Sequence, residues 1–163
     1  LGFVCAAAAW WFAQPTPASL VAGGGVAALG EALRVWAAGH LHKSQEVTAS
    51  GPYRWLAHPL YAGSSVMGIG FAIGAASVPA AILVAVYLGT TLTAAVRTEE
   101  ARLRARFGDQ YVRYRRGAGG PPTVRRRFSL AQAIVNREHR ALAGLVFVWL
   151  MLLAKATYNG AFG

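Results

Sequence analysis

The sequence predicts an all-α integral membrane protein, a bundle of about five transmembrane helices that forms a single domain over residues 1–163. Hydrophobic residues make up 55% of the chain and charged residues only 13%, whereas a soluble domain carries about 25% charged residues. The apolar residues come in long runs rather than in alternation, and several runs approach the roughly 20 residues that cross a bilayer. These observations indicate a multi-pass membrane protein.

The first two apolar segments cover residues 1–13 and 19–41, with a turn over residues 14–18 between them. The first is too short for a hydrocarbon core of about 30 Å, so we interpret it as the C-terminal part of a spanning helix. It lacks a basic region followed by a cleavage site and does not resemble a signal peptide. Because the chain starts at Leu1, we expect an initiator Met or a further piece before it.

Two more helices are predicted over residues 61–77 and 79–107. The first is rich in small residues, which allow neighbouring backbones to approach closely in a membrane. The second is apolar up to Arg97 and charged beyond it, so we expect it to leave the bilayer there. Gly108 is a suitable residue to end this helix.

The last part of the chain should hold a short interfacial helix and a final apolar helix. Ser129 precedes residues 130–135 and is a suitable N-cap for the interfacial helix. The final helix covers residues 141–156 and is expected to start near Arg137. With it, the sequence predicts five membrane-spanning helices, or four complete spans and a partial first span.

Two polar segments, about residues 41–60 and 97–140, fall on the same membrane face when the spans are counted in order. Twelve of the 16 Lys and Arg residues lie between Arg97 and Arg140. Excess basic charge marks the cytoplasmic face and favours contact with anionic lipid headgroups, which explains this block better than nucleic-acid binding does. With no eukaryotic targeting signal visible, we expect a bacterial inner membrane.

The stretch over residues 50–63, S-G-P-Y-R-W-L-A-H-P-L-Y-A-G, separates two strongly apolar segments. Pro52 and Pro59 keep their preceding residues out of helical geometry, and Pro59 suits the first position of a helix. His58 and Tyr61 should then lie at a helix N-terminus, where free N–H groups and the helix dipole favour an anion.

Other polar residues allow two interpretations each. Glu31 and Arg34 share a helix face, either as an ion pair that fixes helix packing or as groups that reach a substrate cavity. Glu99 and Glu100 either support the helix through Arg residues three or four positions on, or accept hydrogen bonds from a ligand ammonium or ribose. The histidines have no distinctive metal-ligand spacing, and we predict no metal site; Cys5 is expected to be a small buried hydrophobe.

Two motifs carry a resemblance. The chain reads G-P-Y-R-W-L-A-H-P-L-Y-A-G and, about 36 residues later, T-E-E-A-R-L-R-A-R-F-G-D-Q-Y-V-R-Y. Together they resemble the isoprenylcysteine carboxyl methyltransferase family, which overlaps in motif with the phospholipid methyltransferases. The resemblance covers roughly residues 30–116. It implies an S-adenosylmethionine-dependent methyltransferase with a cytosolic cofactor pocket and a membrane-soluble or lipid-like acceptor.

The resemblance also implies the site residues. His58 and Tyr61 would hold the carboxylate end of S-adenosylmethionine, and Glu99 and Glu100 its ammonium or ribose side. The remaining residues carried over as cofactor-binding are Pro59, Leu60, Gly63, Tyr111 and Tyr114.

One position departs from the family, which commonly has Arg before the His-Pro pair where this chain has Ala57. Either another Arg supplies the charge, or the acceptor is not a prenylcysteine carboxylate. A carboxylate acceptor needs no general base and is well oriented by a guanidinium. We therefore predict a carboxylate, with Arg54 and Arg97 as catalytic residues and Arg34 as a further candidate; sulfur and amine acceptors stay open.

Two rival functions remain. Sterol-reductase-type membrane enzymes, which use NADPH, share an F-G-x-x-Y pattern like the one that starts at Phe107. A non-enzymatic scaffold would instead bind anionic lipid through residues 125–127.

Overall fold

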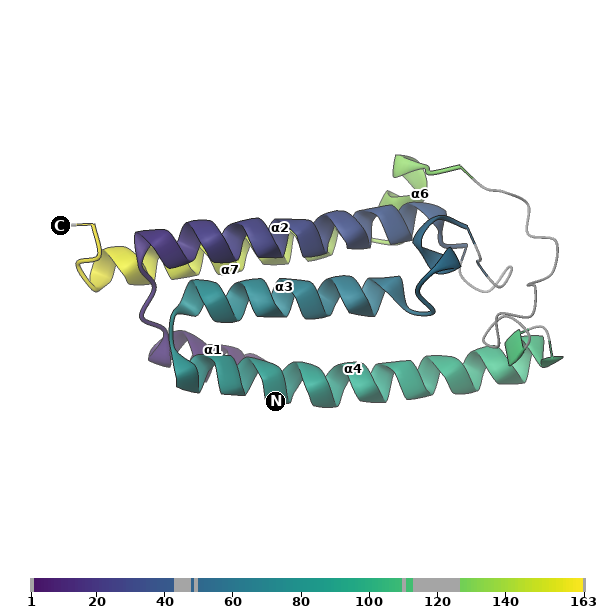
Figure 1. Cartoon of the computed structure of the whole chain (residues 1–163), viewed down its shortest axis with the longest axis horizontal. Coiled ribbons are helices and arrows are strands. Elements are labelled where there is room, and N and C mark those ends of the chain that lie inside the picture. The colour runs from purple at the N-terminus through teal and green to yellow at the C-terminus, as the bar shows by residue number, and fades with distance from the viewer. Residues whose placement is uncertain (1, 43–47, 49, 110, 113–126, 163) are drawn as a thin grey trace.

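The protein is a bundle of long helices that run side by side (Figure 1). The computed structural model describes residues 2–42, 48, 50–109, 111–112 and 127–162. Within these residues every regular element is helical, which confirms the all-α prediction. The elements in order are α1 (Gly2–Phe12), α2 (Pro17–His40), the 3₁₀ turn η1 (Gly51–Arg54), α3 (Pro59–Ala75), α4 (Val78–Phe107), α6 (Leu130–Val135) and α7 (Glu138–Tyr158).

The helix ends follow the capping signals in the sequence. Thr16 caps α2 through a capping box, in which its side chain accepts from the Ser19 N–H at 3.1 Å and the Ser19 hydroxyl accepts from the Thr16 N–H at 2.9 Å. This cap and Pro17 start α2 two residues before the predicted position. Gly108 ends α4 with a positive φ of 47°, as predicted. Ser129 caps α6, because its hydroxyl oxygen accepts a hydrogen bond from the backbone N–H of Gln132 at 3.3 Å.

Among the described residues, three helices are long and apolar enough to cross a membrane: α2, α4 and α7, with 24, 30 and 21 residues. The other two predicted spans, α1 with 11 residues and α3 with 17, are shorter apolar helices. Large apolar side chains such as Phe3, Val21 and Phe147 project outward from the bundle, where they suit contact with lipid.

The most extensive helix contact is between α2 and α3, and glycines lie in it. A Cβ atom added to Gly30 would lie 2.7 Å from the Gly63 carbonyl oxygen, and one added to Gly70 would lie 2.5 Å from the Ala27 nitrogen. Real Cβ atoms do not approach backbone this closely, so only residues without a side chain fit here. Small residues at intervals of three or four positions are the usual device for close packing in membranes.

The C-terminal end of α2 is held by α6. The Asn136 side-chain nitrogen donates to the carbonyl oxygens of Ala38 and Leu41, each at 2.8 Å, and Gln132 donates to Leu41 at 3.0 Å. The last carbonyls of a helix have no partner within it, so these amides complete the end of α2. The start of α7 is thereby held against the same end of the bundle.

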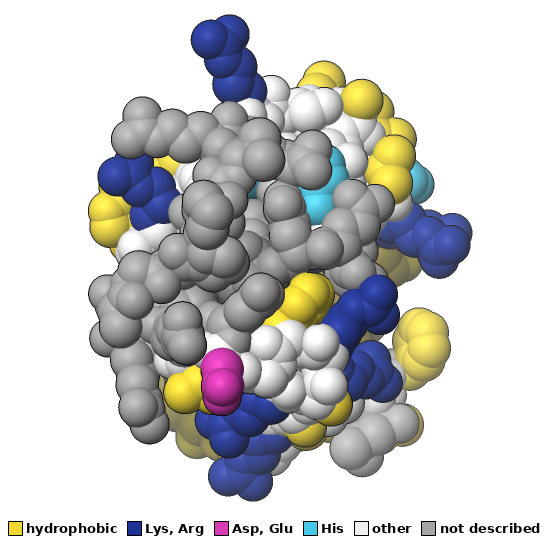
Figure 2. Space-filling model, turned by 90° about the vertical axis from the view of Figure 1, so that its right-hand side faces the viewer, with side chains coloured by type: hydrophobic (Ala, Val, Ile, Leu, Met, Phe, Trp, Pro, Cys, Tyr) yellow, Lys and Arg dark blue, Asp and Glu magenta, His cyan; other side chains and the backbone are white. Residues whose placement is uncertain are grey.

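The described parts of both polar segments lie at one end of the bundle (Figure 1). The end of α2, the start of α3, the charged part of α4 and α6 gather there, as the sequence predicts. Viewed onto this end, Lys and Arg side chains surround the rim (Figure 2). The opposite end carries Lys155, whose ammonium lies 4.8 Å from the centre of the Trp10 ring.

Replacing Gly30 by alanine should destabilise the protein by about 1–3 kcal/mol, because the added methyl group enters the α2–α3 contact. The matched control is Gly25→Ala on the same helix, where an added Cβ meets no atom within 4 Å. Thermal unfolding of both variants in detergent measures the difference. Equal unfolding temperatures would show that the glycine contact does not fix the distance between α2 and α3.

Candidate active site

A polar cavity of about 580 Å³ lies at the basic end of the bundle, between the start of α3 and the charged part of α4. Its volume is within the range of small-molecule sites. It is lined by Leu41, His42, Thr48, Tyr53, Ala57, His58, Pro59, Leu60, Tyr61, Ala94, Ala95, Thr98, Glu99, Arg102, Leu103 and Tyr111.

His58 connects the two motifs that define this cavity. Pro59 begins α3, so His58 is the N-cap residue, with φ −135° and ψ 65°, and its imidazole is turned towards α4. There its Nε2 atom lies 3.2 Å from a carboxylate oxygen of Glu100, and its Nδ1 atom lies 3.9 Å from one of Glu99. The His-Pro turn and the Glu-Glu helix, 42 residues apart in sequence, therefore touch.

The two glutamates have different environments. Glu100 contacts His58 and also pairs with Arg104 at 3.8 Å, one helical turn on, which is the support role that the sequence allowed. Glu99 lines the cavity, and its side chain is 42% exposed to solvent. Of the two, Glu99 is placed to receive a hydrogen bond from a ligand.

Aromatic rings form a second feature of the cavity. The Tyr61 ring lies 5.8 Å from the His58 ring, tilted by 38°. Tyr53 and Tyr111 are buried and line the same space. Electron-rich ring faces next to a carboxylate suit a ligand that carries positive charge. Tyr114 lies outside the described residues.

Four of the predicted site residues that the structure describes do not line the cavity: Glu100, which contacts it through His58, and Arg54, Arg97 and Gly63. Arg54 is exposed, with its guanidinium 5.7 Å from the Trp55 ring, and Arg97 is exposed on α4. Gly63 instead belongs to the α2–α3 contact, where an added Cβ would lie 2.6 Å from the Arg34 side chain.

Several cavity residues were not predicted. On α4 they share one face at helical spacing, with Ala95, Thr98 and Arg102 in the same stripe as Glu99. That spacing was available in the sequence as a continuation of the Glu-Glu motif along one helix face.

Arg34 forms the ion pair with Glu31 that the sequence allowed. Its Nε atom lies 3.7 Å from Glu31 one turn earlier and 2.6 Å from Glu138 at the start of α7. Its guanidinium also donates to the Ser64 hydroxyl and, at 3.5 Å, to the Leu60 carbonyl. Arg34 thus fixes helix packing, and it also lines a second, apolar cavity. No sequence spacing pointed to Glu138, which is 104 residues away.

The fold is that of a helical membrane protein with a polar cavity at its basic end. A family model described as "Phospholipid methyltransferase" matches residues 18–110, more than half of the chain. The chain therefore belongs to the phospholipid methyltransferase family, within the isoprenylcysteine carboxyl methyltransferase-like group. It is a membrane methyltransferase. Comparisons with curated proteins and with solved structures gave no match.

The contact between His58 and Glu100 should be measurable as a coupling between α3 and α4. In a double-mutant cycle of His58→Ala and Glu100→Ala, we expect the two losses of unfolding free energy to be non-additive by about 1 kcal/mol. Denaturant unfolding of the wild type, both single variants and the double variant measures this. Strict additivity would mean that the two side chains do not interact in the folded protein.

Proposed function

We propose that the protein transfers a methyl group from S-adenosylmethionine to a membrane-soluble, lipid-like acceptor, and that the polar cavity holds the cofactor. The observation that carries this proposal is that His58 and Glu99, from two distant motifs, line one cavity in a member of a methyltransferase family.

The residues of the cavity fit the cofactor. S-adenosylmethionine carries an ammonium, a carboxylate, a ribose and a sulfonium, and so needs both acidic and basic partners. The cavity offers the Glu99 carboxylate, the Arg102 guanidinium and the His58 imidazole. Three tyrosine rings supply faces that attract a sulfonium. The first turn of α3 has no side-chain cap, which leaves its N-terminus suited to a carboxylate.

Each group then has a task. Glu99 accepts hydrogen bonds from the ammonium or ribose, while His58 and Tyr61 hold the carboxylate end. Glu100 acts through His58, which it contacts at 3.2 Å, and is a positioning residue. Tyr111, only 2% exposed, excludes water from the inner wall. Exclusion of water strengthens all of these polar contacts.

The chemistry itself comes from the cofactor, because its sulfonium makes the methyl group electrophilic and its carbon–sulfur bond electrons return to sulfur on transfer. The protein has to align the acceptor atom with the methyl carbon. A carboxylate, the acceptor we favour, reacts without losing a proton, whereas an amine would release one. Arg54 and Arg97 adjoin cavity-lining residues in the chain and remain our candidates for orienting a carboxylate.

We also propose that the cavity faces the cytoplasm. The described part of the chain at this end carries Arg102, Arg104, Arg127 and Arg140, a distribution that the positive-inside rule assigns to the cytoplasmic side. The same side chains suit anionic lipid headgroups.

Binding of S-adenosylhomocysteine to the purified protein tests the cofactor assignment by calorimetry. Glu99→Gln should weaken the affinity by about tenfold, because a hydrogen bond to a charged group contributes about 1.5–3 kcal/mol and an amide keeps part of it. Asp109→Asn is the matched control, an exposed carboxylate that does not line the cavity.

If Glu99→Gln binds S-adenosylhomocysteine as tightly as the wild type does, Glu99 does not contact the cofactor. Binding of NADPH in place of S-adenosylhomocysteine would favour a reductase instead.

A further inference from the structure

The end of the bundle opposite the polar cavity carries the Lys155 ammonium among aromatic rings. Its Nζ atom lies 4.8 Å from the centre of the Trp10 ring, 5.6 Å from that of Trp11 and 5.9 Å from that of Tyr158. The faces of aromatic rings attract a cation at these distances, because they are electron-rich. These four residues, the Lys155 cluster, therefore fix an ammonium whose long side chain would otherwise be mobile.

Hydrogen bonds join the two helices that form the Lys155 cluster. The Trp10 indole nitrogen on α1 donates to the Met151 carbonyl oxygen on α7 at 3.0 Å. The Asn159 side-chain nitrogen, just after α7, donates to the Gln14 side-chain oxygen, just after α1, at 3.4 Å. The ring positions around the ammonium are thus set by the fold.

The position of Lys155 along α7 places it at a membrane interface. Helix α7 begins at Glu138 at the basic end, and a rise of about 1.5 Å per residue puts Lys155 about 25 Å further along. A hydrocarbon core is about 30 Å thick, and a lysine side chain extends its ammonium towards the head groups. Trp and Tyr side chains are also typical of this depth. The ammonium therefore reaches the level of the lipid phosphates.

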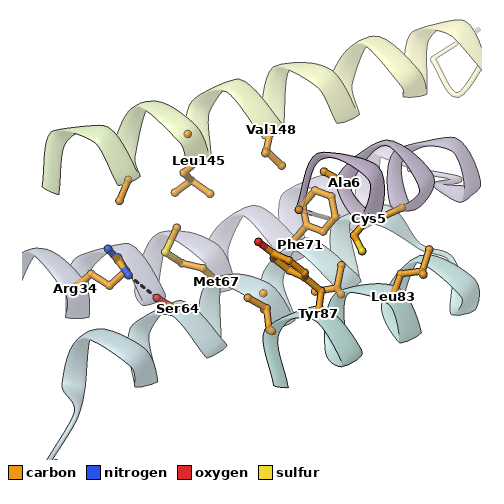
Figure 3. A pocket seen from close by; sticks show the side chains of 17 residues that line it. Cys5, Ala6, Arg34, Ser64, Met67, Phe71, Leu83, Tyr87, Leu145 and Val148 are labelled. Carbon is orange, nitrogen blue, oxygen red and sulfur yellow. Dashed lines mark hydrogen bonds between the residues drawn. The ribbon is translucent and has the colours of Figure 1, made fainter. Parts of the chain in front are cut away.

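No carboxylate side chain among the described residues pairs with Lys155. The sequence has six Asp and Glu residues. Two of them, Glu31 and Glu138, pair with Arg34. Arg34 lies at one end of the apolar cavity, whereas α1 lines the other end (Figure 3). The other acidic residues that the structure describes lie on the charged part of α4 or just after it: Glu99, Glu100 and Asp109.

An anion from the lipid complements this cluster. A lysine ammonium is a common partner of phosphate, and Lys155 also lies in the last turn of α7, where the helix dipole favours a cation. A head group with its own ammonium, as in phosphatidylethanolamine, would place like charge beside Lys155. Phosphatidylglycerol has a phosphate and no cation, so it fits the cluster better.

We propose that the Lys155 cluster binds the phosphate of an anionic phospholipid in the leaflet opposite the polar cavity. The Lys155 ammonium donates to the phosphate oxygens, and the rings hold the ammonium in place. Trp11 and Tyr158 are 71% and 86% exposed, so a lipid can reach the cluster. The site is separate from methyl transfer. Its occupation would stabilise the contact between α1 and α7, and would make that contact depend on the lipid composition of this leaflet.

Tryptophan signals report on the site directly, because two of the five tryptophans belong to it. The protein, with its indole nitrogens labelled with ¹⁵N, is placed in nanodiscs of dioleoyl phosphatidylcholine, and a rising fraction of the lipid is replaced by dioleoyl phosphatidylglycerol. We expect the Trp10 and Trp11 signals, assigned by substitution with phenylalanine, to shift until they saturate. The Trp149 signal is the internal control, because this ring lies inside the bundle beside Gly24 and Gly74.

Three variants separate binding at Lys155 from a general effect of charge. Lys155→Gln should weaken the apparent affinity for phosphatidylglycerol by about tenfold, the loss expected for a hydrogen bond between charged groups. Lys155→Arg keeps the charge and should respond like the wild type. Arg106→Gln is the matched control, because it also removes one exposed positive charge, but at the basic end. It should respond like the wild type.

Three results would overturn the proposal: Trp10 and Trp11 signals that phosphatidylglycerol does not move, a response of Lys155→Gln equal to that of the wild type, or an equal response to dioleoyl phosphatidylethanolamine. The last result would mean that the rings respond to lipid packing and not to an anion.

Discussion

Helices α2 and α3 touch through their backbones, and the position of Arg34 depends on that contact. Gly30 and Gly63 face each other with no room for a Cβ atom. Arg34, one turn beyond Gly30, is thereby brought close enough to donate to Ser64 and Leu60. A larger spacing between the helices would remove these bonds and separate Arg34 from the first turn of α3. Close packing of α2 against α3 thus determines where the Arg34 guanidinium lies relative to the first turn of α3.

The basic end of the bundle is assembled by polar contacts of a different kind. Amide side chains of α6 complete the end of α2, and His58 connects the start of α3 to Glu100 on α4. Each contact joins segments that are far apart in the chain. They hold the walls of the polar cavity together, while the Glu99 carboxylate, which accepts a hydrogen bond from the Tyr61 hydroxyl, stays partly exposed in the cavity. Walls that are held in place before a cofactor binds lower the entropic cost of binding.

The elements that could be predicted from sequence were those with local signals. Thr16, Pro59, Gly108 and Ser129 define helix ends by capping and backbone preference, and the helices end at or near the predicted residues. Counting spans predicted only that residues 58 and 100 lie on one membrane face; their contact at 3.2 Å is a finding of the structure. By contrast, the pairing of Arg34 with Glu138 and the apolar cavity depend on how helices pack, which no local pattern encodes. Of the five predicted spans, three are helices of membrane length in the described residues, and α1 and α3 are shorter apolar helices.

Direct labelling would locate the cofactor most clearly. Ultraviolet cross-linking of S-adenosylmethionine radiolabelled in its methyl group, followed by mapping of the labelled peptides, reports which residues surround it. Our account predicts label in two separate peptides, one containing Tyr53 and Tyr61 and the other containing the α4 residues around Glu99. Label confined to α7, or to one of these two segments with none in the other, would contradict a cofactor site formed jointly by the His-Pro turn and the Glu-Glu helix.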